Sequence, residues 1–308
     1  MRLSRAEFDQ QFHAVIRKFS GIVGFAAQHL GTGEEIRVNA DEVFGTASTF
    51  KLAVLVEVFR QARAGRIALD ERLAMRTEDI VRGSGVLKEL SPGLQPTVKD
   101  LAMLMVIVSD NTATNMLIDK VGGVETINRT MQVDYGLRTI VVHTKIDFNV
   151  IGDDVRRLAE ASPSDLMRLV KLIVQRKAVD ATASDAMLNI MRRQQYLDQV
   201  PRYFNYNPYA PELKITQSMR VASKTGFYPG TRVDTGAVLL PDGNEIVYCA
   251  AAQGSADRSM TIEAEPMVVN GLLGKLMLEY WWPAEEEGTA TLPTPYMASF
   301  VEPVGTQR

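Results

Sequence analysis

The four residues Ser48-Thr-Phe-Lys51 place a serine hydroxyl and a lysine amine three positions apart. On a helix, this spacing puts both side chains on one face of the first turn. A serine hydroxyl is a poor nucleophile until a nearby base takes its proton, and a desolvated lysine with a lowered pKa is such a base. The pattern therefore indicates acyl transfer through Ser48, with Lys51 as its base. A helix-capping serine beside a surface lysine would give the same four letters.

A second motif, Ser109-Asp110-Asn111, follows the apolar run 101–108. In a catalytic interpretation the Ser109 hydroxyl relays a proton to a leaving group, the Asn111 amide holds a substrate carbonyl, and Asp110 fixes the local turn. In a structural interpretation the same residues end one helix and cap the next. Both interpretations place the motif at a junction between two helices.

A third motif, Lys224-Thr225-Gly226, ends an expected strand. A glycine there lets a ligand lie close against the backbone, and Lys224 and Thr225 would offer a charge and a hydroxyl to a substrate carboxylate. The next residue, Phe227, would donate a backbone N–H that forms an oxyanion hole with the N–H of Ser48. Alternatively, the segment is an edge strand that runs into the turn Phe-Tyr-Pro-Gly.

Hydrophobic periodicity indicates the elements that must position these motifs. Helices are expected over 5–19, 52–63, 98–108, 112–120, 164–174 and about 261–280, and strands over 21–29, 35–39, 219–225, 234–240 and 245–253. The strands near the two ends are expected to join into one antiparallel sheet, with the helical block inserted between them.

This order predicts an α+β fold, in which an antiparallel β-sheet with flanking helices carries an inserted all-α subdomain. Residues 1–47 and 213–283 would form the discontinuous α/β subdomain, 48–212 the helical subdomain, and 284–308 a flexible C-terminal tail. A cleft between the sheet and the helical block is where a site is expected.

Composition excludes several other classes of protein. The 308 residues include 34 basic and 37 acidic side chains, and this balance gives no field that attracts nucleic acid or anionic membrane. The single cysteine, Cys249, and three histidines offer neither an internal disulfide nor a helical zinc site. No apolar stretch is long enough to span a membrane. We therefore expect a monomer without a metal or cofactor, a membrane span or a nucleic-acid partner.

The first ten residues bear on the compartment. They are charged and contain no apolar run of the kind found in a secretory leader. As numbered, the chain is expected in the cytoplasm. A periplasmic or secreted protein whose leader is missing from the sequence would look similar.

Taken together, the three motifs resemble a known family. Ser-x-x-Lys, Ser-Asp-Asn and Lys-Thr-Gly, in this order, are the signature of class A β-lactamases and penicillin-binding proteins. The resemblance covers about residues 15–282 and includes the segments 109–123 and 162–166. It implies the β-lactamase/transpeptidase fold and assigns these roles: Ser48 is the acylated nucleophile, Lys51 its base, Ser109 the proton shuttle, Asn111 a substrate ligand, and Lys224, Thr225 and Gly226 the wall that faces the substrate carboxylate.

The chain departs from this family in the omega loop, where class A enzymes carry a glutamate that activates the deacylating water. An alignment on Asn149 puts Lys145 at that position, and no glutamate occurs from position 126 to 159. Asp147 is the nearest carboxylate and is a candidate general base if the loop sits closer. Alternatively, it is a loop residue paired with Lys145 or Arg138.

A second departure follows the Lys-Thr-Gly motif. The arginine that many class A enzymes carry there aligns with Thr235, and Arg232 is the candidate substitute, with Asp234 as its partner. These departures leave three functions open: a β-lactamase, a penicillin-binding or sensor-like protein that acylates without efficient deacylation, and an esterase or peptidase of the same fold. The expected substrate is a small β-lactam or an acyl-peptide.

Overall fold

A five-stranded antiparallel sheet lies at the centre of the computed structural model, which describes residues 3–210, 212–214 and 219–282. Its strand order is β2-β1-β8-β7-β6. The strands are β1 (Ile22–His29), β2 (Glu35–Val38), β6 (Arg220–Tyr228), β7 (Thr231–Leu239) and β8 (Glu245–Gln253). The first two strands join the last three through β1 and β8, so the single antiparallel sheet expected from the sequence is confirmed. The tail expected over 284–308 lies outside the described residues.

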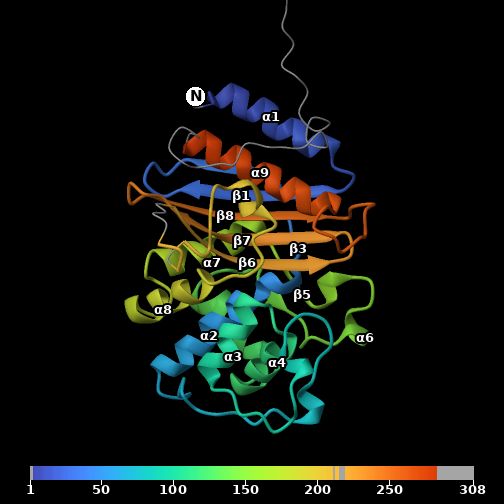
Figure 1. Cartoon of the computed structure of the whole chain (residues 1–308), viewed down its shortest axis with the longest axis vertical. Coiled ribbons are helices and arrows are strands. Elements are labelled where there is room, and N and C mark those ends of the chain that lie inside the picture. Colours follow the sequence, from blue (N-terminus) through green and yellow to red (C-terminus); the bar gives the residue numbers. More distant parts are fainter. Residues whose placement is uncertain (1–2, 211, 215–218, 283–308) are drawn as a thin grey trace, which may run out of the picture.

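Helices cover both faces of this sheet (Figure 1). On one face lie α1 (Arg5–Lys18) and α9 (Glu265–Trp281), which pack against each other and on the sheet. On the other face lies α7 (Pro163–Val174), with the remaining helices beyond it. Buried apolar side chains accordingly form two clusters, one on each side of the sheet.

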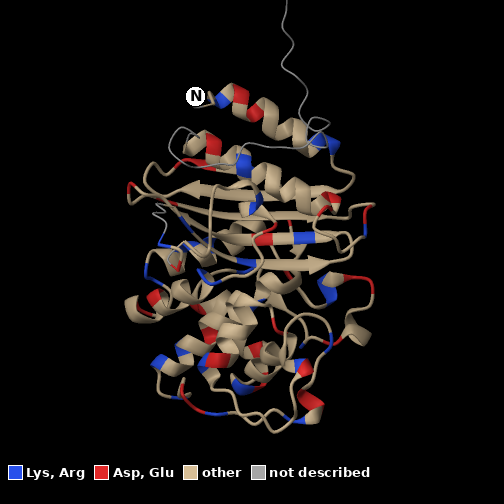
Figure 2. Ribbon diagram, in the orientation of Figure 1, with Lys and Arg blue, Asp and Glu red and all other residues tan. Residues whose placement is uncertain are grey.

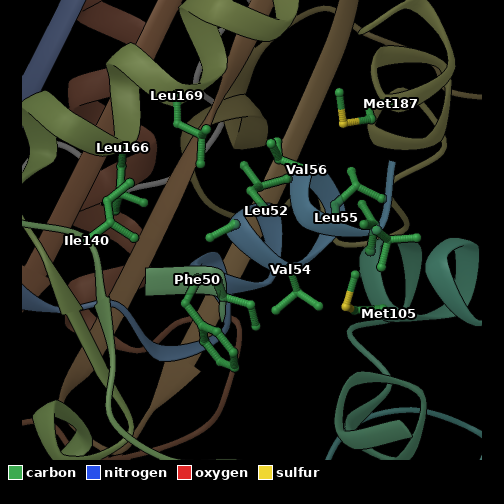
Figure 3. Packing of buried hydrophobic residues seen from close by; sticks show 14 of the residues in the cluster. Phe50, Leu52, Val54, Leu55, Val56, Met105, Ile140, Leu166, Leu169 and Met187 are labelled. Carbon is green, nitrogen blue, oxygen red and sulfur yellow. The ribbon is translucent and has the colours of Figure 1, made fainter. Parts of the chain in front are cut away.

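The helical block on the second face is built around α2 (Lys51–Arg63), which is buried on nearly every side. Around it lie α3 (Val98–Ile107), α4 (Asn111–Lys120), α5 (Val124–Arg129), α6 (Phe148–Ile151) and α8 (Ala181–Met191). Figure 3 shows Leu52, Leu55 and Val56 of α2 in one cluster with Met105 and Met187. Ten of the 13 residues of α2 are buried, so the residues at its first turn, Lys51 included, are held by packing on most sides.

Sequence signals for helix ends explain where most helices begin. Ser4 and Glu7 form a capping box at α1, and Thr97 and Asp100 form another at α3. The last helix, expected from about position 261, instead begins at Glu265. If the helix began earlier, Pro266 would lie beyond its first turn, where the proline ring clashes with the backbone of the preceding turn.

A second sheet, which the sequence does not predict, joins three short strands in the order β3-β5-β4. They are β3 (Phe44–Gly45), β4 (Val141–Val142) and β5 (Ala159–Ala161). Strands of two or three residues are too short to show a periodic pattern. This sheet ties the segment before Ser48 to both ends of the segment 143–158.

Charged residues of both signs are interspersed over the elements (Figure 2). None of the helices within the described ranges is long and apolar enough to cross a membrane. The same ranges contain no group of three or more His, Cys, Asp or Glu side chains that could hold a metal ion.

Candidate active site

Ser48 lies in a short 3-10 helix, η1 (Ala47–Phe50), directly before α2. Ala47 has a φ of +43°, a left-handed conformation that costs an L-residue about 1–3 kcal/mol and recurs at active sites. The turn is held by Thr46, whose N–H donates to Ala159 O at 3.0 Å. Ser48 is the half-buried residue of this otherwise buried turn, and it lines a cleft.

Lys51 is completely buried at the first position of α2. Its Nζ donates to Ser109 O at 2.7 Å and to Asn111 Oδ1 at 2.8 Å, and lies 3.1 Å from Ser109 Oγ. Burial, followed by the positive charge of Lys224, lowers the pKa of Lys51 well below its usual value, against the opposing charge of Asp110. A neutral amine can accept a proton, so this environment suits a base.

Ser109 lies between α3 and α4, with a φ of +55°. Its Oγ is 3.1 Å from the Nζ atoms of both Lys51 and Lys224. The structure therefore brings together the serine of the second motif and the lysines of the first and third motifs.

Asp110 fixes this turn, as predicted from the sequence. Its carboxylate accepts backbone N–H groups of Val86, Leu87 and Ala113 at 2.7, 2.8 and 2.9 Å. Gly85 packs so closely that a Cβ atom there would lie 2.3 Å from the Asp110 carboxylate. The start of α4 is thereby held against the segment 83–87.

The Asn111 amide, expected as a substrate ligand, lines the cleft and is also engaged by the protein. Its Oδ1 accepts hydrogen bonds from Lys51 and from Ser84 Oγ, the latter at 3.1 Å, and its Nδ2 donates to Arg82 O at 3.0 Å. Ser84 also donates to Ser109 O at 2.7 Å. The sequence alone gives Ser84 no role, although its position between two turn glycines marks a constrained loop.

The third motif lies inside β6 rather than at its end, because the strand continues to Tyr228. Lys224 is fully buried, and its Nζ donates to Thr225 O at 2.6 Å. Burial lowers the pKa of Lys224 to about 7, against the opposing charge of Asp234. Thr225 of the motif is fully buried, whereas Phe227, the next residue after it, lines the cleft.

Gly226 allows the edge strand to approach the nucleophile. A Cβ atom at this position would lie 2.7 Å from Thr46 O and 2.9 Å from Ser48 N. β6 is the last strand of the sheet, so one of its edges has no neighbouring strand, and η1 packs against β6. This close approach places the backbone around Phe227 beside the Ser48 N–H.

Arg232 is absent from the described lining of the cleft, and its expected role as a carboxylate ligand stays a prediction. The side chain is fully buried, and its Nη1 donates to Tyr228 O at 2.7 Å and to Thr231 O at 2.9 Å. Its Nη2 donates to Ser259 O at 2.9 Å. These backbone carbonyls hold the two terminal nitrogens of the guanidinium, whereas its buried Nε has no hydrogen-bond partner among the described residues.

Asp234, the expected partner of Arg232, instead lies directly across from Thr225 in the β6–β7 pair. Its Oδ2 accepts the Val200 N–H at 3.0 Å, and burial raises the pKa of Asp234 to about 8. The strand position that faces Thr225 thus carries an acid rather than a cation.

Asp147 does not line the cleft, although its neighbours Ile146 and Phe148 do. Its carboxylate caps α6 by accepting the Asn149 N–H at 2.9 Å, and the residue is exposed and absent from the described lining of the cleft. Lys145 pairs with Asp119 at 2.8 Å rather than with Asp147. Because the cap turns the carboxylate onto its own helix, this position argues against Asp147 as the deacylating base.

The cleft has a volume of about 460 Å³ and is walled mainly by apolar and aromatic side chains. Those that no motif identified are Ile146, Phe148, Ile151, Leu158, Tyr196, Tyr228, Pro229, Met260, Ile262 and Met267. One carboxylate, that of Asp198, also lies in this wall. These residues come from separate segments, so no local pattern could have grouped them.

Comparison with known proteins gives a consistent result. The model of the "Beta-lactamase enzyme family" matches residues 7–281. A β-lactamase structure from Sphaerobacter thermophilus is 29% identical, covers 90% of this chain and 97% of that one, and has a TM-score of 0.78. A structure of PBP-A is 27% identical, covers 91% and 97%, and has a TM-score of 0.75.

Among curated relatives, β-lactamase L2 from Stenotrophomonas maltophilia is 34% identical over 112 residues, which is 36% of this chain and 37% of that protein. The alignment with a β-lactamase from Rhodobacter capsulatus spans 52% of the relative's length. These curated matches are therefore partial, whereas the family model spans nearly the whole chain. On that match and on the shared fold, the chain belongs to the β-lactamase enzyme family.

Proposed function

We propose that this protein opens β-lactam rings through an acyl-enzyme on Ser48. The observation that carries the proposal is the placement of the Ser109 hydroxyl, 3.1 Å from each of two buried lysine nitrogens, in the cleft that Ser48 lines. In this scheme neutral Lys51 takes the Ser48 proton as its oxygen attacks the lactam carbonyl. Ser109 then delivers a proton to the departing ring nitrogen, with Lys224 beside it.

The developing oxyanion would be held by the N–H groups of Ser48 and Phe227. The close approach at Gly226 supports this assignment, because it brings the backbone of β6 against Ser48 N. Loss of one such donor costs about 3–4 kcal/mol of transition-state stabilisation. The nucleophile, base and oxyanion donors all come from this chain, so the scheme requires no cofactor, and we expect it to operate in a monomer.

A second candidate function is favoured by the placement of Asp147. With that carboxylate turned onto α6, and no glutamate between positions 126 and 159, the omega-loop segment offers the acyl-enzyme no carboxylate that lines the cleft. The protein would then acylate rapidly and deacylate slowly, as a penicillin-binding protein does. Its similarity to PBP-A is consistent with this behaviour.

A time course with a chromogenic cephalosporin, followed by intact mass, separates these outcomes. Steady turnover supports a β-lactamase, and one stoichiometric adduct that persists supports the slowly deacylating protein. Both signals should be lost in Ser48→Ala. Absence of both turnover and adduct in the wild type would overturn acylation at Ser48.

A further inference from the structure

The loop 81–87 is held against the start of α4 by several hydrogen bonds. The Val81 N–H donates to Thr112 Oγ1 at 2.9 Å, and the Asn111 N–H donates to Ser84 O at 3.1 Å. The carboxylate directly before α4 accepts two further N–H groups of the same loop. The Ser84 side chain is therefore fixed relative to the turn that carries the second motif.

The Ser84 hydroxyl and the Lys51 amine bind the same two oxygen atoms. Ser109 O accepts from Lys51 Nζ and from Ser84 Oγ, both at 2.7 Å. Asn111 Oδ1 accepts from Lys51 Nζ at 2.8 Å and lies 3.1 Å from Ser84 Oγ. A hydroxyl carries one proton, so the shorter contact makes Ser109 O the main acceptor of Ser84. A donor from a different segment of the chain thus shares its acceptor with Lys51.

The number of hydrogens on the Lys51 amine makes this sharing important. A neutral amine has two N–H bonds and one lone pair. Ser109 O and Asn111 Oδ1 can take both N–H bonds, which leaves the lone pair free to accept a proton. A protonated amine has three N–H donors and needs a third acceptor. Ser109 Oγ lies at 3.1 Å, but Lys224 Nζ contacts it at the same distance. These surroundings therefore satisfy the neutral amine better than the charged one.

We propose that Ser84 is a positioning residue for the base, because its hydroxyl holds the two oxygens that receive the Lys51 amine. The inference rests on the proposed acylation of Ser48 and adds a residue to that reaction. An oxygen that already accepts the Ser84 proton offers less negative charge to Lys51. We therefore expect the hydroxyl to favour the neutral amine over the charged one.

The charged groups that face Lys51 are Lys224, on β6, and Asp110, directly before α4. They act on the amine in opposite directions, and both are retained when only Ser84 is changed. A change in the titration of Lys51 in a Ser84 variant is then assigned to the lost hydroxyl.

The test compares the pH dependence of adduct formation in the wild type and in Ser84→Ala, with an uncharged penicillin ester and intact mass. Where Lys51 is mostly protonated, we expect Ser84→Ala to react about tenfold more slowly. The acidic limb should lie about one pH unit higher, and the two rates should converge once Lys51 is neutral in both proteins. Ser84→Thr keeps the hydroxyl and should restore the wild-type limb. Ser91→Ala removes an exposed serine just beyond the same loop and is the matched control.

A purely structural role of Ser84 predicts a different profile, because a loosened or partly unfolded site lowers the rate by the same factor at every pH. A uniform loss, or an acidic limb of Ser84→Ala at or below the wild-type pH, would therefore overturn the inference. A thermal melt of each variant shows whether the fold persists.

A titration that needs no acylation separates this inference from the proposed function. In Ser48→Ala, the ¹³C chemical shift of Lys51 Cε reports the protonation of the amine as pH is changed. Addition of Ser84→Ala should move the midpoint up by about one pH unit. Ser84→Cys fills the same space with a weak S–H donor, so it should move the midpoint in the same direction by less, and it serves if Ser84→Ala does not fold.

The two measurements together decide between the inference and the proposed function. If the wild type forms no adduct while the midpoint moves, the proposed acylation fails and the positioning role of Ser84 stands. An unmoved or lower midpoint in the folded variants overturns the positioning role, whether or not the wild type forms an adduct.

Discussion

Lys51 and Lys224 direct their Nζ atoms at the same hydroxyl, each lying 3.1 Å from Ser109 Oγ. Burial already disfavours the charged form of both amines, and the charge of Lys224 lowers the pKa of Lys51 further. A proton on Lys224 therefore favours the neutral form of Lys51. The proposed reaction requires this arrangement, in which Lys51 is neutral and can act as a base while protonated Lys224 lies beside Ser109.

Removal of the base should abolish most acylation. We expect Lys51→Ala to lower the second-order rate constant for adduct formation about 10²–10⁴-fold, the usual contribution of a positioned base. Intact mass over time measures it. Lys145→Ala removes an exposed lysine that pairs with Asp119 and serves as the control. A loss below tenfold would show that another group deprotonates Ser48.

The charge of Lys224 should set the acidic limb of the pH profile. Acylation requires neutral Lys51, so the rate rises with pH through the pKa of Lys51. Because the positive charge of Lys224 lowers that pKa, Lys224→Met should raise it and move the limb to higher pH. The shift is measured with an uncharged penicillin ester, so that carboxylate binding does not contribute. If the acidic limb of Lys224→Met stays at the wild-type pH, the charge of Lys224 does not lower the pKa of Lys51.

Asp234 should make stability depend on pH. Its pKa is raised from 3.8 to about 8 in the folded chain, so the folded state holds the proton more tightly. The stabilisation is fully present below about pH 3.8 and is lost as pH rises through about 8. Asp234→Asn keeps an oxygen for the Val200 N–H, and should flatten the fall in Tm between pH 4 and 8. An identical Tm profile in Asp234→Asn and in Asp153→Asn, whose side chain is fully exposed, would contradict this assignment.

Asp147 should be dispensable for deacylation. Because its carboxylate accepts the Asn149 N–H and does not line the cleft, Asp147→Asn should leave the rate of recovery of the unmodified mass within about twofold of the wild type. The measurement follows the acyl-enzyme by mass after excess β-lactam is removed. A tenfold slower recovery would return Asp147 to the role of general base.

Gly226 should tolerate no side chain. A Cβ atom would lie 2.7 Å from Thr46 O and 2.9 Å from Ser48 N, both of them backbone atoms that cannot move cheaply. Gly226→Ala should push β6 away from η1 and lower acylation about 10²–10³-fold, as loss of an oxyanion donor does. A thermal melt run alongside checks that the fold persists. Wild-type acylation in a folded variant would exclude the proposed oxyanion hole.

The three motifs could be recognised in the sequence because the chemistry proposed for them restricts residue type and spacing together. Ser48 and Lys51 lie on one short turn, and Ser109 and Lys224 stand in tripeptides that are rare by chance. The long helices and the five-stranded sheet were equally accessible, since each repeats its apolar residues with a regular period.

The remaining features depend on tertiary contacts. Arg232 carries the charge that a carboxylate site needs, yet the carbonyls of Tyr228, Thr231 and Ser259 hold it in the interior. The residues next to Arg232 in the sequence do not predict its hydrogen bond to the carbonyl of Ser259. The aromatic wall that includes Phe148 and Tyr196 is equally hidden, because its members meet only after the helical block folds onto the sheet.

The strand order β2-β1-β8-β7-β6 has a consequence for synthesis of the chain. Ser48 is synthesised well before β6, β7 and β8. The strand β1 can pair only once β8 has been made, and β6 is linked to β1 only through β7 and β8. A nascent chain thus carries its nucleophile long before the strand that supplies the second oxyanion donor is in place. Chemical competence should therefore appear only after β8 has been synthesised, so that a chain cut before β6 is inert rather than partly active.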